Sequence, residues 1–318
     1  MTSLLNNYDE DVLVKLILSG LNQVLRIKRI DKKYINETKV HKIVYNVAER
    51  LNLDNITRSW YMRGCYIWCN DPIEAFLSGK DINSINTIIS SIPKDIAKTI
   101  VNTIKSVIEE LGVFRLKSEG YHFLEEIYRR FAPSEFRDLY ITNLKFKKSF
   151  ESFIEQLYPN KRLYFVDVDS TIVSESLSEL HMAISKTIED HRIVNVFIEY
   201  TTLLETIALG IEEKARNNEV TEKLIEFCKE AYVYYDNEVW KLPATEIAKR
   251  TIKGQNSRNV LQNLQRNFNI TLNNVKVYLK IYEKRIDELE LNPSEDFLLE
   301  RIESSLPAKE FLKALRDI

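Results

Sequence analysis

Two properties of this 318-residue chain exclude whole classes of protein. Only 7 residues are glycine and 7 are proline, so phosphate-binding glycine loops are scarce and the backbone must be mostly helical. The 45 basic and 47 acidic residues are mixed along the chain and give a net charge of −2, which removes any global electrostatic case for binding nucleic acid or an anionic membrane. We predict an all-α, multi-domain protein with a minor β-hairpin and an elongated helical second half.

The expected location follows from the hydropathy pattern. No stretch approaches roughly 18 uncharged apolar residues, and Asp9 and Glu10 stand where a signal peptide needs positive charge and an apolar core. We therefore predict a cytoplasmic protein that does not bind membranes.

Cys65 and Cys69 have no second Cys or His pair nearby, so no metal ion and no cofactor is expected.

Residues 1–133 are expected to form a helical N-terminal domain. Apolar residues recur at helical spacing in 11–28, 37–51 and 93–111, and a further helix over 120–131 stops at a proline. The clearest stripe consists of Ile96, Ile100, Ile104, Val107 and Leu111. We place a domain boundary near residue 133.

A short part of this domain resembles a known family. Lys39 to Tyr45 reads Lys-Val-His-Lys-Ile-Val-Tyr, and Trp60-Tyr-Met-Arg-Gly64 follows it. Over about residues 39–70 this pattern resembles the Panacea or SocA-like antitoxin domain, in which a Lys-Leu-x-Lys-Leu-Leu-Tyr helix precedes an aromatic turn. Arg63-Gly64-Cys65 stands in place of the Gly-Pro step of that family. The resemblance implies a helical, non-catalytic module that binds protein partners and is sometimes attached to a DNA-binding unit.

The aromatic segment from Arg58 to Cys69 has two interpretations. Its isolated Gly64 predicts a short hairpin or loop. The surrounding side chains have the composition of interface hot spots, and our candidate protein-binding residues are Trp60, Tyr61, Arg63, Tyr66 and Trp68. The alternative is core packing, because aromatic residues are mostly buried wherever they occur.

Residues 134–292 are expected to form a long-helix domain. From Ser176 to Arg216 apolar residues recur at spacings of three and four, which fits one helix of about 40 residues, roughly 60 Å long, or two helices with a break at Asp190. Because one small domain does not cover so long a stripe, we predict a homodimer. An amphipathic tail over 293–318 ends in a helix that begins at Pro307 and carries Phe311, Leu312, Leu315 and Ile318.

One segment of the long-helix domain resembles an enzyme motif. An apolar run from Leu163 ends in Asp167-Val-Asp169-Ser-Thr171, which resembles the first motif of the haloacid dehalogenase phosphatases. The resemblance implies Asp167 as phosphoryl acceptor, Asp169 as general acid and base, and Mg²⁺ nearby, giving a phosphohydrolase as the alternative function. The later Ser or Thr, Lys and acidic pair of that family are missing. The competing interpretation is that Asp169 or Ser170 caps the following helix.

Residues 244–266 have the pattern of a helix-turn-helix, with a turn over 253–256 and Ser257 capping the second helix. If this unit binds double-stranded DNA, the contacts to phosphates and bases are expected from Lys249, Arg250, Lys253, Arg258, Asn259 and Gln262. The alternative is a structural helical hairpin.

These patterns favour binding over catalysis. We predict a non-catalytic, antitoxin-like regulatory protein that binds a protein partner and contacts double-stranded DNA through its C-terminal half.

Overall fold

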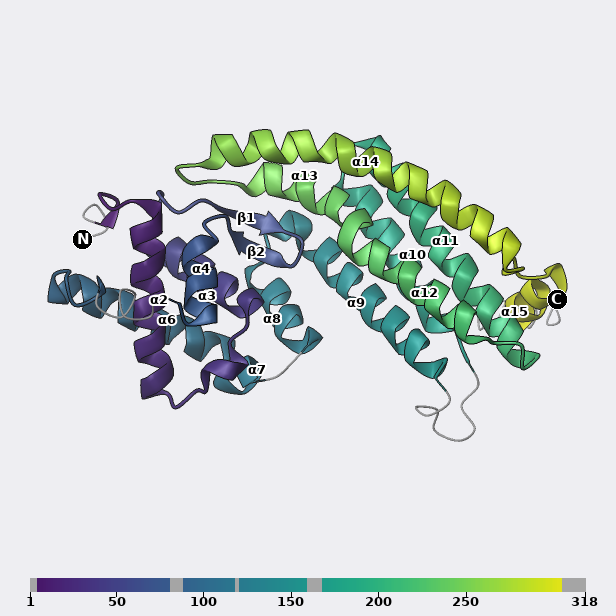
Figure 1. Cartoon of the computed structure of the whole chain (residues 1–318), viewed down its shortest axis with the longest axis horizontal. Helices are drawn as coiled ribbons and strands as arrows, with labels where there is room; N and C mark the ends of the chain where they lie inside the picture. The colour runs from purple at the N-terminus through teal and green to yellow at the C-terminus, as the bar shows by residue number, and fades with distance from the viewer. Residues whose placement is uncertain (1–4, 81–87, 118–119, 159–167, 305–318) are drawn as a thin grey trace, which may run out of the picture. The chain divides into compact units, whose positions relative to one another are not determined.

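The computed structural model describes residues 5–80, 88–117, 120–158 and 168–304, which fall into two compact units. Unit 1 comprises residues 1–144 and 240–271, and unit 2 comprises 145–239 and 272–318. Helices predominate in both units, and the only sheet among the described residues is a two-stranded hairpin (Figure 1). The prediction of a mostly α-helical protein with a minor β-hairpin is confirmed.

The division into units differs from the expected boundaries at residues 133 and 292. Helix α9 (Ser134–Gln156) begins in unit 1 and continues into unit 2, and α14 (Ser257–Glu288) does the same. Two of the three points at which the chain passes between the units therefore fall inside continuous helices, where no proline, glycine or polar linker marks them, and the third lies between Val239 and Trp240. In the tail expected over 293–318, residues Glu295–Ser304 form helix α15 of unit 2. Residues 305–318, with the helix expected from Pro307, lie outside the described residues.

Unit 1 packs helices around the hairpin. Its other elements are α2 (Glu10–Ile27), η1 (Lys32–Tyr34), α3 (Glu37–Arg50), α4 (Asp71–Ser78), α6 (Lys94–Leu111), α7 (Val113–Lys117), α8 (Tyr121–Phe131), the first part of α9, α13 (Lys241–Thr251) and the first part of α14. Helix α2 packs on α4 and α6, and α3 lies against the second strand. The apolar stripe predicted for α6 is buried throughout, which explains why its periodicity was a reliable signal.

The hairpin pairs β1 (Arg58–Tyr61) with β2 (Gly64–Ile67) in antiparallel register, with Trp60 opposite Cys65. The chain just after α13 continues this pairing, because the backbones of Arg58 and Lys253 exchange N–H···O bonds of 2.9 and 3.0 Å. The hairpin is thus held between α3 on one strand and the chain after α13 on the other.

Unit 2 contains the rest of α9, α10 (Thr171–Thr187), α11 (His191–Arg216), α12 (Glu222–Tyr234), the π-helical η2 (Tyr235–Val239), the rest of α14, and α15. The break at Asp190 is confirmed, since its side chain caps α11 by accepting a hydrogen bond from the Arg192 amide. The predicted stripe is buried in this core at Leu177, Leu180 and Ile184 on α10 and along α11. Because these residues pack inside unit 2, they are not available to pair with a second copy of the chain. The homodimer stays a prediction, and the stripe no longer supports it.

Helix α11 has the length and apolar composition of a membrane-spanning helix. However, 61% of its most apolar window is buried inside the structure, and a core helix of this length has the same composition.

Candidate binding surfaces

The two segments of the Panacea-like pattern are in contact in the structure. The Lys42 ammonium of α3 donates a hydrogen bond of 2.7 Å to the carbonyl oxygen of Cys65 on β2. One residue earlier, His41 stacks on the Tyr66 ring at 4.2 Å, and its Nδ1 accepts a hydrogen bond from the Ile67 amide. The motif side chains on α3 thus fix the position of the hairpin.

Burial sets the protonation of these α3 residues. It lowers the pKa of His41 to about 3 and the pKa of Lys42 to about 8. At neutral pH His41 is an uncharged ring, and Lys42 is a buried cation that binds a backbone carbonyl. Neither is exposed to a partner, so their role is to position the hairpin.

The two faces of the hairpin have different surroundings. Trp60 is 1% exposed and is surrounded by Tyr45, Tyr128 and Tyr140, with ring centres 5.3 to 6.4 Å away. Trp60 therefore belongs to the core of unit 1, as the core-packing interpretation predicts. It cannot contact a partner in this structure.

The other aromatic residues form a half-buried cluster on the opposite face, which we call the outer aromatic cluster: Tyr61, Tyr66 and Trp68. Their ring centres lie 5.1 to 6.0 Å apart, and Trp68 Nε1 donates to Ser59 Oγ. Tyr61 and Trp68 border a cavity of about 130 Å³ whose other walls come from α13 and α14, including Asn263, Asn267 and Phe268. Arg63 is exposed at the hairpin turn.

The helices expected at 244–266 are present as α13 and the start of α14. Lys249 of α13 lies over the ring of Phe268, about three turns into α14, so the two helices run side by side and antiparallel (Figure 1). DNA-binding helix-turn-helix units cross more steeply. This geometry is that of the alternative, a helical hairpin.

The turn between these helices is anchored to the rest of unit 1. Gly254 has φ +116°, and a Cβ at this position would lie 2.4 Å from the Cα of Thr57. The buried Glu10 carboxylate accepts hydrogen bonds from the Thr57 amide and from Asn256 Nδ2, both at 2.6 Å. The turn is therefore a docked structural element.

The predicted DNA-binding residues divide into two sets. Lys249, Arg250 and Lys253 make ion pairs within unit 1, with Glu246, Glu135 and Glu49 at 3.1, 3.3 and 2.6 Å. The remaining three, Arg258, Asn259 and Gln262, are exposed on α14. Among the described residues Arg258 has no ion-pair partner.

Helix α14 carries a polar outer face that the sequence reasoning missed. Its exposed members within unit 1 recur at spacings of three and four, which places them on one side of the helix: Arg258, Gln262, Arg266 and Asn269. Between Glu246 and Glu283 the chain contains no acidic residue at all. The signal was present in the sequence, but the net charge of −2 for the whole chain concealed this local positive stretch.

The residues of the phosphatase-like motif are placed only in part. Asp167 lies outside the described residues. Asp169 Oδ1 accepts a hydrogen bond of 2.8 Å from the Thr171 amide at the start of α10, whereas Ser170, the N-cap residue, makes no side-chain capping bond. Ser170 donates from both its amide and its hydroxyl to the buried Glu212 carboxylate. Around these residues the described chain is helical, without the parallel sheet that the resemblance implies.

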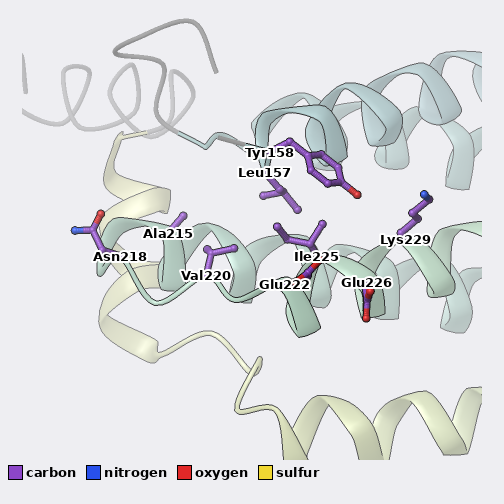
Figure 2. Close-up of a pocket in the computed structure, with 9 residues that line it drawn as sticks. All are labelled: Leu157, Tyr158, Ala215, Asn218, Val220, Glu222, Ile225, Glu226 and Lys229. Atoms are coloured by element: carbon purple, nitrogen blue, oxygen red, sulfur yellow. The ribbon is translucent and has the colours of Figure 1, made fainter. Parts of the chain in front are cut away.

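Unit 2 also contains a groove of about 460 Å³ between the end of α9 and α12. Leu157 and Ile225 face each other across it, and Tyr158 extends over α12 (Figure 2). Within the described part of the chain, no group of three or more His, Cys, Asp or Glu side chains could hold a metal ion.

Comparison with known proteins gives one match. Residues 99–309 match a family described as a domain of unknown function (DUF8098), and because the match covers most of the chain, the chain belongs to this family. No curated protein and no solved structure matches. The matched region contains the polar face of α14 and the groove, whereas the outer aromatic cluster lies outside it.

Proposed function

We propose that this protein is a non-catalytic, cytoplasmic regulatory protein that binds double-stranded DNA through the polar outer face of α14. The supporting observation is the exposed, acid-free series of guanidinium and amide groups that begins at Arg258. Guanidinium groups suit phosphates, and Asn and Gln amides suit adenine edges in the major groove. Lys249, Arg250 and Lys253, which are paired within unit 1, are not part of this proposed surface.

The test is the salt dependence of DNA binding, followed by fluorescence anisotropy of labelled duplexes. Each neutralised phosphate adds about 0.9 to the slope of log affinity against log salt. Replacing Arg258 and Arg266 together by Ala should therefore lower the slope by about 2 and weaken binding at low salt. Lys94 and Lys98, exposed on α6, provide a control in which the double Ala variant loses the same charge and keeps the wild-type slope. The absence of duplex binding by the wild type at low salt would refute the proposal.

A second candidate function is binding of a protein partner at the outer aromatic cluster. It is favoured by the half-buried rings of Tyr61 and Trp68 beside a cavity, because aromatic side chains at the rim of a pocket are typical binding anchors. The Panacea-like pattern supports the same surface, as an antitoxin-like module would bind its partner directly.

This candidate is tested by capture from the native host with tagged protein. Trp68→Ala should lose a partner that the wild type retains, and Tyr158→Ala, an exposed tyrosine of unit 2, should retain it. Circular dichroism of both variants verifies folding. Equal capture by Trp68→Ala and the wild type would exclude the cluster as the binding surface.

A further inference from the structure

The cavity beside the outer aromatic cluster lies within unit 1, and its size limits what it can hold. Its volume is about 130 Å³, whereas pockets for whole small-molecule ligands measure about 300–1,000 Å³. The cavity therefore suits one group of a larger ligand, either one side chain of a protein or one base of a nucleic acid.

The rings and the charge of the lining select the kind of group that fits. The half-buried rings of Tyr61 and Trp68 border the cavity on the side of the hairpin, and the buried Phe268 ring borders it on the side of α14. Aromatic faces of this kind stack on planar groups. Lys241 is the one charged residue among the described residues of the lining, so a positively charged group is disfavoured.

The rim on α14 carries amide groups. Asn263 and Asn267 lie one turn apart on this helix, and both are exposed. Each carboxamide offers two N–H donors and a carbonyl acceptor. An aliphatic group would cover these amides without hydrogen-bonding to them, whereas the edge of a nucleobase carries both donors and acceptors. The lining thus matches a planar ring with a polar edge.

The rim of the cavity is continuous with the polar outer face of α14. At about 100° per residue, Asn263 is rotated by about 60° from Arg266 and by about 40° from Asn267, so the three lie on neighbouring rows of the helix. The unit 1 part of α14 contains no acidic residue that would repel phosphates. A nucleic acid uses both features, since its phosphates suit the guanidinium groups and its bases suit the cavity. A protein side chain would use the cavity alone.

We propose that this cavity receives one unpaired base of a DNA whose duplex part lies on the polar outer face of α14. The base stacks on Trp68 and turns its polar edge toward Asn263 and Asn267. The preferred ligand is thus a duplex with a bulged base, because a base that is already unpaired need not break a base pair to enter the cavity. This inference rests on the proposed DNA binding by α14 and names the form of DNA; a protein partner at the same cluster is the competing outcome.

The test compares a perfect duplex with the same duplex carrying one extra, unpaired thymine. We expect the full-length wild type to bind the bulged duplex about tenfold more tightly, as followed by fluorescence anisotropy. Trp68→Ala should bind both duplexes with the wild-type affinity for the perfect one. Asn267→Leu, a change at an exposed helical position, should also lower the preference, and its matched control Asn195→Leu, exposed on α11 of unit 2, should keep it.

Photo-crosslinking from 5-iodouracil at the bulge then locates the contact, and peptides containing Tyr61, Trp68 or residues 263–268 are expected. Equal affinity of the wild type for the two duplexes, or crosslinks to other peptides, would overturn the base site and leave DNA binding by α14 standing. If the wild type bound no duplex at all, the proposed function and this inference would fall together. Loss of a captured protein by Trp68→Ala, with the preference for the bulged duplex retained, would assign the cavity to that protein instead.

Discussion

The two units bury charged side chains against different partners, and the difference follows from their backbones. Unit 1 buries cations whose donors reach carbonyls of a strand, of loops and of the last turn of a short helix: Lys39 donates to Leu116 of α7, Lys42 to Cys65, and Arg58 to Leu53 and Ile56. Unit 2 instead pairs its buried charged side chains with other side chains: Lys147 with Asp236, and Glu212 with Arg301. Helices satisfy their own backbone groups, whereas a hairpin and its loops leave carbonyls that need other donors.

This comparison predicts that removing a buried cation that serves backbone carbonyls in unit 1 costs more than removing a buried hydroxyl whose helical carbonyl is already satisfied in unit 2. All three tryptophans, Trp60, Trp68 and Trp240, belong to unit 1, so tryptophan fluorescence follows the unfolding of that unit alone. Far-ultraviolet circular dichroism follows both units. The two signals together assign each effect to its unit.

The largest effect is expected for Arg58→Ala. Arg58 is 2% exposed, pairs with Glu49 and donates to two carbonyls, at 2.6 and 2.8 Å. Its removal leaves a partly buried carboxylate and two carbonyls without their donor, which should cost about 3–5 kcal/mol of unfolding free energy. The measurement is denaturant unfolding followed by tryptophan fluorescence. Arg129→Ala, which breaks an exposed pair with Glu125, should cost under about 1 kcal/mol, and equal losses in the two variants would contradict the comparison.

An intermediate effect on stability is expected when the pH is lowered, because His41 takes up a proton when the protein unfolds. Its pKa is about 6.5 when unfolded and about 3 when folded, so the unfolded chain binds the extra proton between these values and stability falls as the pH falls through this window. Between pH 7 and pH 5 the wild type should lose about 2 kcal/mol from this group. His41→Asn keeps an acceptor for the Ile67 amide and cannot titrate, so its fluorescence-detected stability should change less over the same range. Identical pH dependence in the two proteins would rule out His41 as the source.

The smallest effect is expected for Tyr200→Phe in unit 2. The buried Tyr200 hydroxyl donates to the Ala231 carbonyl at 2.9 Å, but that carbonyl already accepts a bond from the Tyr235 amide within the helix. Loss of the hydroxyl should cost about 1 kcal/mol, seen by circular dichroism. A loss as large as that of Arg58→Ala would contradict the comparison, because it would show that a helical carbonyl depends equally on a side-chain donor.

The sequence by itself determined the local features of this protein. It predicted the mostly helical class, the hairpin at Arg58–Cys69, the buried stripe of α6 and the break at Asp190, because periodicity and capping act over a few residues. It also contained the acid-free stretch of α14, although that stretch becomes a candidate surface only once its exposure is known.

The tertiary structure decided which of these residues are accessible. Trp60 and Tyr61 are neighbours of the same chemical class, and only the packing of α8 and α9 against one face of the hairpin buries the first and leaves the second half-buried. Lys253 and Arg258 are equally basic, yet Glu49, two hundred residues earlier in the sequence, pairs with the first alone. Burial and pairing depend on elements distant in sequence, and two of the three boundaries between units pass through helices whose local pattern is continuous. No local pattern carries that information.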